Sequence, residues 1–435
     1  MAGRGLVLAA PASGSGKTTV TLGLLRALRD RGVPVRGAKS GPDYIDPRFH
    51  EAACGQVCVN LDAWAMTPAR LATLAGGDGL LLVEGAMGLF DGAPPNGAGS
   101  SAELARHLGL PVLLIVDAAR MAQSVAPLVA GFAGHDPDLQ VAGVILNRVG
   151  SARHEATLRR ALGPLGLPVL GAVPRRARMA HPARHLGLVQ ALERPDLERF
   201  IATCGGIVRD AVDLDALMSC AAPLPKPSAP VARMAPPAQR IALAQDAAFA
   251  FAYPHLLADW RAQGAEICLF SPLADQSVPE ADLIFLPGGY PELYAGQLAA
   301  ANTFLTSLRD AAQSSEIYGE CGGYMVLGDG LTDADGTRHA MAGLLPLETS
   351  FAERALHLGY RRIRAAHGPF RGSFTAHEFH YCKTVKAKGA PLFDAWDAEG
   401  TLLAPMGLRA GQVSGSFLHI IDCDHGALPK PDAQA

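Results

Sequence analysis

The sequence predicts an α/β protein built from two domains, and three observations support this prediction. Short apolar strands alternate with helical segments in both halves of the chain, which is typical of parallel, doubly wound sheets. A glycine-rich loop follows the first strand, and a proline-rich stretch separates the two series of elements. The length of 435 residues allows two or three domains with substantial cores. We expect one domain over residues 1–221, a semi-rigid linker over 222–239 and a second domain over 240–435.

Composition and charge exclude several classes of protein. A formal net charge of −3 gives no electrostatic case for binding nucleic acid or an acidic membrane. The eight cysteines lack the spacing of a disulfide framework or a zinc site, so we expect unpaired thiols in a reducing cytoplasm. The apolar run at residues 6–10 is too short for a signal peptide, and no other run is long enough to span a bilayer. We therefore expect a soluble, cytoplasmic protein.

The first domain contains six expected strands, with helices between them. A helix over residues 18–29 has leucines near helical spacing and stops at Gly32. The polar residues of interest follow the ends of the strands, and that edge of an open parallel sheet is where ligands bind. The expected strands are 6–10, 33–37, 80–84, 112–116, 141–146 and 169–173.

The loop over residues 11–19 follows a strand and opens a helix, which is the context of a P-loop. Its glycines let backbone N–H groups turn towards phosphate oxygens, and the N-terminus of the helix adds positive potential. Lys17 is suited to the outer phosphates of ATP, and the Thr18 hydroxyl is suited to Mg²⁺. Pro11 stands where the first glycine of the motif usually lies, and the alternative is a glycine-rich turn with an exposed lysine. The expected ATP-binding residues of the loop are Gly14, Ser15, Gly16, Lys17, Thr18 and Thr19.

Polar residues at other strand ends extend the predicted site. Glu84 ends a strand where a metal-ligating acid belongs opposite a P-loop, since Mg²⁺ needs few protein carboxylates. Asp91 either lines the same cleft or caps a turn. Asn147 and Pro174 also follow strands and could contact an adenine ring, although Asn and Pro commonly occupy strand ends for structural reasons.

A second polar loop, residues 39–47, also follows a strand. One glycine and two prolines stiffen it, and it presents Lys39, Asp43, Tyr44 and Asp46. Acids beside prolines are usually turn formers. Next to a P-loop at the ligand edge of the sheet, these residues are better interpreted as contacts to substrate or metal.

The second domain carries a thiol in a reactive context. Its expected strands are 241–244, 267–270, 283–286 and 317–319, and the last of these leads into Cys321. Glycines around Cys321 permit a strained turn, the N–H of Gly322 can face an oxyanion, and the N-terminus of the following helix should lower the pKa of the thiol. The glycine pair that includes Gly289 is suited to a second oxyanion N–H. His419 is the candidate base, although a lone histidine is usually structural.

These phrases together resemble the corrin-ring (hydrogenobyrinate or cobyrinate) a,c-diamide synthases, which are amidotransferases of cobalamin biosynthesis. The resemblance implies an N-terminal dethiobiotin-synthetase-like ATP domain joined to a C-terminal class I glutaminase domain, with Mg²⁺ as cofactor and ATP and glutamine as co-substrates. It extends over nearly the whole chain, and its most specific phrases are 39–47 and 377–381, the second without an assigned role. The phrases are 13–19, 39–47, 84–92, 286–293, 320–323, 377–381 and 415–419.

The resemblance also implies roles for individual residues. Cys321 would attack glutamine and His419 would raise its nucleophilicity, and the released ammonia would displace phosphate from an acyl phosphate of the corrin substrate. Glu84 would bind Mg²⁺, with Asp43 and Asp46 on the metal or substrate side. One position departs from the family pattern: Ile421 stands where class I glutaminases carry a glutamate. A Cys–His dyad and slow hydrolysis of glutamine in the absence of the other substrate are therefore expected.

Several alternatives stay open at this point. Hydrogenobyrinate, cobyrinate and nickel-sirohydrochlorin would present similar acetate groups, and a composition typical of a GC-rich genome favours hydrogenobyrinate. A cobyric acid synthase would amidate other positions of the ring. In a different class, a partitioning-type ATPase switch would carry an inactive glutaminase domain. The expected partners are the corrin polycarboxylate, ATP and L-glutamine, without nucleic acid or membrane, and a homodimer is compatible with these expectations.

Overall fold

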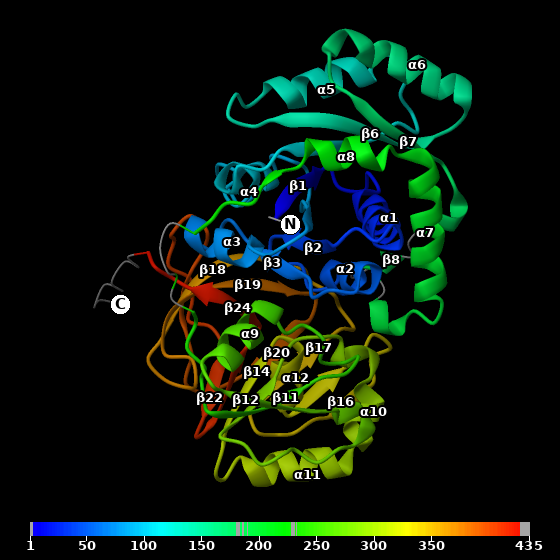
Figure 1. The fold of residues 1–435 in the computed structure, drawn as a ribbon. Helices are drawn as coiled ribbons and strands as arrows, with labels where there is room; N and C mark the ends of the chain where they lie inside the picture. The colour runs from blue at the N-terminus through cyan, green and yellow to red at the C-terminus, as the bar shows by residue number, and fades with distance from the viewer. Residues whose placement is uncertain are drawn as a thin grey trace. The chain divides into compact units, whose positions relative to one another are not determined.

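The computed structural model describes residues 3–179, 183–184, 187–188, 190–227, 231 and 233–426. The chain divides into two compact units, Met1–Val231 and Ala232–Ala435 (Figure 1). The division lies inside the proline-rich stretch 222–239. Among the described residues, no helix has both the length and the apolar character that a membrane crossing requires.

Unit 1 is organised around a largely parallel sheet with the strand order β3-β2-β4-β1-β5-β6-β7. Strand β1 lies near the middle, and the chain winds outwards from it to both edges, which is the doubly wound arrangement predicted from the sequence. The short β10 adds an antiparallel pair to β1. The bounds are β1 (Arg4–Ala9), β2 (Val35–Ser40), β3 (Val59–Leu61), β4 (Leu80–Glu84), β5 (Val112–Asp117), β6 (Val141–Val149), β7 (Val169–Pro174) and β10 (Ala222–Pro223).

Helices connect these strands and enclose an apolar core. Buried leucines of α1 pack with residues of α7 in one cluster. Gly23 makes this close approach possible, because a Cβ at that position would lie 2.4 Å from a methyl carbon of Val208. The bounds are α1 (Lys17–Asp30), α2 (Asp46–Cys54), α3 (Pro68–Ala75), α4 (Ser101–Leu108), α5 (Val125–Gly134), α6 (Ala152–Leu162), α7 (Leu197–Ala211) and α8 (Leu214–Cys220).

Unit 2 contains a second parallel sheet, with the strand order β12-β11-β13-β14-β23-β22. All its pairs are parallel except the last, in which β22 runs antiparallel to β23. Together with unit 1, this sheet confirms the predicted α/β class. The bounds are β11 (Arg240–Ala244), β12 (Glu266–Phe270), β13 (Leu283–Leu286), β14 (Glu316–Glu320), β22 (Leu408–Ala410), β23 (Val413–Ser416), α9 (Pro254–Ala262), α10 (Ala295–Ala300), α11 (Asn302–Ala311) and α12 (Gly322–Leu327).

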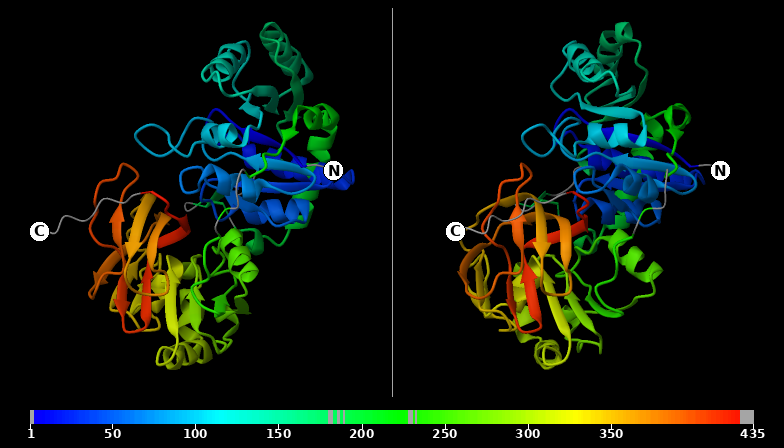
Figure 2. Two further views of the ribbon diagram at one scale, coloured as in Figure 1. Left: turned by 60° about the vertical axis from the view of Figure 1, so that its left-hand side comes forward. Right: turned by 90° about the vertical axis from the view of Figure 1, so that its left-hand side faces the viewer.

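Two four-stranded sheets complete unit 2, and the sequence analysis missed both. Their orders are β16-β15-β17-β20 and β21-β18-β19-β24. Figure 2 shows the second group in orange and red. Its register sets His377 opposite His419 and His357 opposite His380. The bounds are β15 (Gly330–Thr332), β16 (Arg338–Ala340), β17 (Leu347–Ser350), β18 (His357–Ala365), β19 (Gly372–His380), β20 (Lys383–Ala387), β21 (Asp394–Trp396) and β24 (Leu418–Cys423).

Candidate active sites

The glycine-rich loop of unit 1 connects β1 to α1 in a conformation that requires glycine. Gly14 and Gly16 have φ angles of 78° and 79°, in the left-handed region that L-residues with a Cβ rarely adopt. A Cβ on Gly16 would lie 2.4 Å from Nδ2 of Asn147. Asn147 donates from Nδ2 to the Ser15 carbonyl at 2.8 Å, so β6 supports the loop directly. This contact occupies the Asn147 amide, and its predicted contact with adenine stays a prediction.

Lys17 extends from the start of α1 to the loop after β4. Its ammonium donates to the Met87 carbonyl at 2.7 Å. Burial is the main reason that the pKa of Lys17 is lowered, and the carboxylate of Glu84 opposes that effect. Asp91 accepts a hydrogen bond from the Gly88 N–H at 2.9 Å, which is the predicted turn role. Its charge also acts to raise the pKa of Lys17, by less than that of Glu84.

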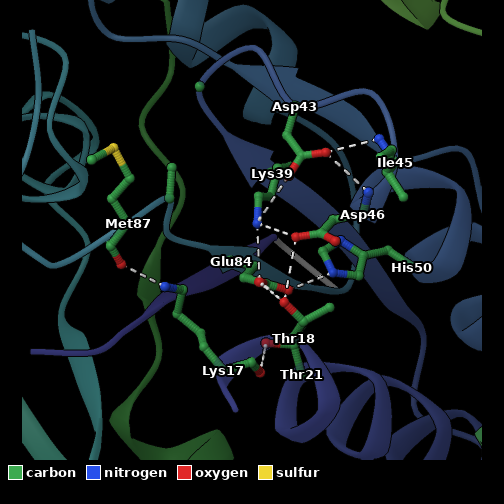
Figure 3. Close-up of polar contacts among 12 residues, drawn as sticks. Lys17, Thr18, Thr21, Lys39, Asp43, Ile45, Asp46, His50, Glu84 and Met87 are labelled. Atoms are coloured by element: carbon green, nitrogen blue, oxygen red, sulfur yellow. Dashed lines mark hydrogen bonds and ion pairs between the residues drawn. The ribbon is translucent and has the colours of Figure 1, made fainter. Parts of the chain in front are cut away.

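Four predicted residues from separate elements meet beside the P-loop (Figure 3). Thr18 Oγ1 donates to Glu84 Oε1 at 2.7 Å and lies 3.4 Å from Asp46 Oδ2. Lys39 Nζ donates to the same Glu84 oxygen at 3.0 Å and to Asp46 Oδ2. The residues come from the N-terminus of α1, the end of β2, the start of α2 and the end of β4. The structure therefore brings together side chains that the sequence placed at strand ends and loop starts.

Electrostatic coupling fixes the charges in this cluster. Burial acts to lower the pKa of Lys39, but Asp46, Glu84 and Asp43 outweigh burial and raise it well above its ordinary value. Burial acts to raise the pKa of Glu84, but Lys39 and His50 outweigh burial and lower it. Burial and the nearby Asp43 raise the pKa of Asp46 to about 7 despite Lys39. Lys39 and Glu84 are therefore ionised at neutral pH, while Asp46 is close to its midpoint.

Sequence reasoning missed His50, which belongs to the same cluster. Its Nε2 lies 2.7 Å from Glu84 Oε2, and its Nδ1 lies 3.5 Å from the Cys58 sulfur. His50 follows Asp46 by four residues on α2, and that spacing sets both side chains on one face of a helix. This spacing was the signal in the sequence that could have identified it.

The other predicted residues of unit 1 have mainly structural contacts. Asp43 Oδ1 accepts from the N–H groups of Ile45 and Asp46 at 2.8 and 3.1 Å, while its Oδ2 lies 3.6 Å from Lys39 Nζ. Tyr44 is buried. Pro174 is the last residue of β7 and is half-buried. Asp43 thus combines the turn role with an ionic contact to the cluster.

In unit 2, Cys321 occupies a strained turn between β14 and α12. Its φ and ψ angles are 45° and −104°, which is a sparsely populated region for a residue with a Cβ. The Cys321 N–H donates to the Ser416 carbonyl at 2.8 Å, and that bond fixes the turn to β23. The predicted elbow geometry is therefore present.

The two predicted oxyanion residues lie next to each other. A Cβ on Gly322 would lie 3.1 Å from the Gly289 nitrogen and 2.7 Å from Pro291 Cδ. A Cβ on Gly289 would lie 1.9 Å from the Ala248 carbonyl oxygen. Only glycine fits at these positions, the Gly289 nitrogen lies beside Gly322, and the Gly322 N–H acts on the Cys321 thiol.

His419 lies on β24 close to the thiol. A Cβ on Gly288 would lie 2.2 Å from His419 Cε1 and 3.3 Å from Cys321 Cβ, so Gly288 packs against both residues. The other side of the imidazole faces Glu320, whose Oε2 lies 3.6 Å from His419 Nδ1. Sequence reasoning missed Glu320, although it directly precedes the predicted nucleophile Cys321.

Burial determines the protonation states of the thiol and the imidazole. It raises the pKa of Cys321 well above its ordinary value, and the Gly322 N–H opposes it only in part. The expectation that the N-terminus of a helix lowers this pKa is therefore wrong, because α12 has only six residues and the sulfur is buried. Burial also lowers the pKa of His419 to about 3. Both groups are neutral at pH 7 in the protein alone.

The phrase 377–381 forms part of a stack of rings beside a cavity of about 490 Å³. His357, Glu378 and His380 present ligand atoms within 4.8 Å of one another. However, the two imidazoles are parallel, with an interplanar angle of 11° and centroids 4.5 Å apart. A metal lies close to the plane of each imidazole that binds it, so these rings do not converge on one ion. Phe417 extends the stack on the other side of His380, with centroids 4.0 Å apart.

Comparison with known families gives the class of the protein first. Residues 6–189 match the CobQ/CobB/MinD/ParA nucleotide binding domain. Residues 240–425 match the CobB/CobQ-like glutamine amidotransferase domain. The fold and the two sites thus define a chain that joins a nucleotide-binding unit to an amidotransferase unit.

Curated relatives give the particular family. The chain is 55% identical over 431 residues to the hydrogenobyrinate a,c-diamide synthase of Brucella suis, covering 96% of this chain and 98% of that protein. It is 55% identical over 429 residues to the protein of the same name from Sinorhizobium sp, and 53% identical over 429 residues to that from Rhodobacter capsulatus, with the same coverage. The chain belongs to the hydrogenobyrinate a,c-diamide synthase family, which confirms the resemblance in the sequence.

Proposed function

We propose that the protein uses ATP and glutamine to convert the a and c acetate carboxylates of hydrogenobyrinate into amides. The observation that carries this proposal is the presence of two chemically distinct sites on one chain. A P-loop lies beside a lysine–carboxylate cluster in unit 1, and a thiol lies beside a histidine in unit 2. The names of relatives that match over nearly their whole length favour hydrogenobyrinate over the other macrocycles.

Unit 1 activates the substrate carboxylate. The backbone N–H groups of residues 14–16 and the ammonium of Lys17 bind the phosphates of ATP. A carboxylate oxygen of the substrate attacks the γ-phosphorus as the bond to the β-phosphate oxygen breaks, which gives an acyl phosphate and ADP. Lys17 and Lys39 stabilise the negative charge on the transferring group. Ammonia then attacks the acyl carbon and loses a proton to the departing phosphate as the C–O bond to phosphate breaks, leaving the amide.

The donor set beside the P-loop fits Mg²⁺. The Thr18 hydroxyl and the carboxylates of Glu84 and Asp46 direct oxygens at one region, and the ammonium of Lys39 shows that this region attracts a cation. Mg²⁺ prefers a ligand set of this kind, in which a hydroxyl and few carboxylates are completed by phosphate and water oxygens. Thr18 and Glu84 would hold the ion, and Asp43 is the further predicted ligand. A carboxylate oxygen of Asp46 also lies 3.4 Å from the Thr18 hydroxyl. When bound, Mg²⁺ would neutralise charge on the phosphates.

Unit 2 supplies ammonia from glutamine. His419 takes the proton of the Cys321 thiol as the sulfur attacks the side-chain amide carbon. The N–H groups of Gly289 and Gly322 stabilise the oxyanion, and the proton passes to the departing ammonia. Water then hydrolyses the thioester and releases glutamate. Because the pKa values of the thiol and the imidazole keep both groups neutral in the protein alone, we expect slow hydrolysis of glutamine until ligands bind.

The experiment that tests this function is mass spectrometry of products after incubation with ATP, Mg²⁺, glutamine and each candidate macrocycle separately. Two successive acid-to-amide conversions on hydrogenobyrinate alone would support the proposal. Conversion of the nickel or cobalt macrocycle instead would reassign the substrate. ATP hydrolysis without conversion of any macrocycle would favour a partitioning-type switch protein. We also propose that the protein is a cytoplasmic homodimer that binds neither nucleic acid nor membrane. Light scattering tests the oligomeric state.

A further inference from the structure

A buried carboxylate lies on the far side of the candidate base. Glu320 is the last residue of β14 and directly precedes Cys321. Its Oε2 lies 3.6 Å from Nδ1 of His419, and its Oε1 accepts from the Ile420 N–H at 3.2 Å. Both side chains are almost completely buried. The backbone bond to Ile420 fixes the carboxyl group in this position.

The expected position for such a carboxylate is occupied by an apolar residue. Ile421 follows His419 by two residues on β24, so alternation sets both side chains on the same face of the strand. The Ile421 side chain is fully buried, and its carbonyl accepts from His255. Position 421 therefore offers no carboxylate to the imidazole, whereas Glu320 on β14 places one 3.6 Å from His419 Nδ1.

We propose that Glu320 is the positioning residue for His419, its carboxylate accepting a hydrogen bond from Nδ1–H and so directing Nε2 to the Cys321 thiol. This inference rests on the proposed glutaminase role of the same site. With the hydrogen on Nδ1, the lone pair of Nε2 is free to take the thiol proton. The carboxylate then stabilises the imidazolium that forms, as the acid of a hydrolase triad does.

The contact between Glu320 and His419 is not yet a hydrogen bond in this structure. A separation of 3.6 Å is longer than an ordinary N–H···O bond, and catalytic hydrogen bonds often shorten when substrate binds. Burial raises the pKa of Glu320 to about 8, against the opposing effects of the Ile420 N–H and the Tyr318 side chain. Glu320 is therefore mostly protonated at neutral pH, and the acceptor form grows as pH rises towards 8. The titratable groups that act on it are Tyr318 on the same strand, Cys321 at the start of α12 and His419 on β24.

The test is the isosteric substitution Glu320→Gln. The amide oxygen can still accept from Ile420, whereas the amide nitrogen would face Nδ1 and favour the wrong tautomer of His419. We expect kcat for glutamine hydrolysis to fall about 10²-fold, less than the loss for a tightly bonded triad acid. Amidation with ammonium as nitrogen source should stay at the wild-type rate. Glu316→Gln, on the same strand and outside the site, is the matched control and should leave both activities unchanged.

A pH profile separates positioning from a structural role. In the wild type, kcat/KM for glutamine hydrolysis should rise with a limb near pH 8, as Glu320 loses its proton. This limb should be absent from Glu320→Gln. A wild-type rate and profile in Glu320→Gln would overturn the inference while leaving the proposed function intact. If the wild-type protein itself hydrolyses no glutamine, the proposed function fails instead.

A second measurement covers the case in which Glu320→Gln does not fold. Nitrogen NMR of ¹⁵N-histidine-labelled wild-type protein above pH 8 reports the tautomer of His419, with the signal assigned by its loss in His419→Gln. A proton on Nδ1 is the expected result. A proton on Nε2 would overturn the inference.

Discussion

Replacing Gly288 with alanine should separate the two activities of the protein. An added Cβ would lie 2.2 Å from His419 Cε1 and 2.9 Å from its Nε2, whereas ordinary contact begins at 3.4 Å. The methyl group or the ring must therefore yield by 1.2 Å, the difference between 3.4 and 2.2 Å. A misplacement of about 1 Å at a catalytic group costs about 10²-fold in rate.

The assay compares two nitrogen sources in the same preparation. With glutamine, amide formation by Gly288→Ala should fall about 10²-fold, because the imidazole no longer lies where the thiol needs it. With ammonium, amide formation should be unchanged, because Gly288 lies in unit 2 and the lysine–carboxylate cluster lies in unit 1. Overpacking of this kind costs about 1–3 kcal/mol, so the melting temperature should also fall.

Gly296→Ala is the matched control, since its added Cβ would meet its nearest neighbour, His339, at 3.6 Å. It should behave like the wild type in both assays. A Gly288→Ala protein that hydrolyses glutamine at the wild-type rate would refute the placement of His419 against Gly288 and Cys321. Equal losses with glutamine and ammonium would refute the separation of the two sites.

Four further outcomes are expected. Cys321→Ala should abolish amidation from glutamine and leave amidation from ammonium, and loss of both would contradict separable sites. Asp46→Asn should slow amidation or change its order while glutamine hydrolysis continues; unchanged product kinetics would mean that the contact between Asp46 and Lys39 is only structural. His50→Ala removes the partner of buried Glu84 Oε2, so calorimetry should show a loss of about 1–3 kcal/mol, and an unchanged melting temperature would contradict that contact. The pKa of Glu320 is raised from 4.5 to about 8 on folding, so its stabilising contribution is complete below pH 4.5 and declines as pH rises to about 8. Denaturation across this range should therefore show the stability of the wild type falling relative to Glu320→Gln, and a constant difference would contradict the shift.

The parallel sheets and the lysine–carboxylate cluster of unit 1 were predictable from local patterns. Apolar runs such as residues 80–83 are buried on both faces of a parallel strand, and such runs predict strands without further information. Because the carboxyl ends of parallel strands share one edge, Lys39 and Glu84 were expected near the P-loop, and the structure brings them into contact.

The features that were missed depend on long-range contacts. Strand β18 contains several charged and half-exposed residues, so it lacks the alternation that identifies a strand, and it is held by pairing with β19. Glu320 and His419 are 99 positions apart in the chain, and no local pattern indicates their contact. The raised pKa of Cys321 results from burial, which only the folded chain reveals.

The strained backbone of Cys321 has a practical consequence for determining structures of this protein with bound ligands. A residue held at φ 45° and ψ −104° stores about 1–3 kcal/mol that the surrounding structure must offset. Serine or alanine keeps that strain, whereas glycine adopts such angles readily. The inactive variant Cys321→Gly should therefore have a higher free energy of unfolding than the wild type, and it would be better suited to crystallisation with bound glutamine.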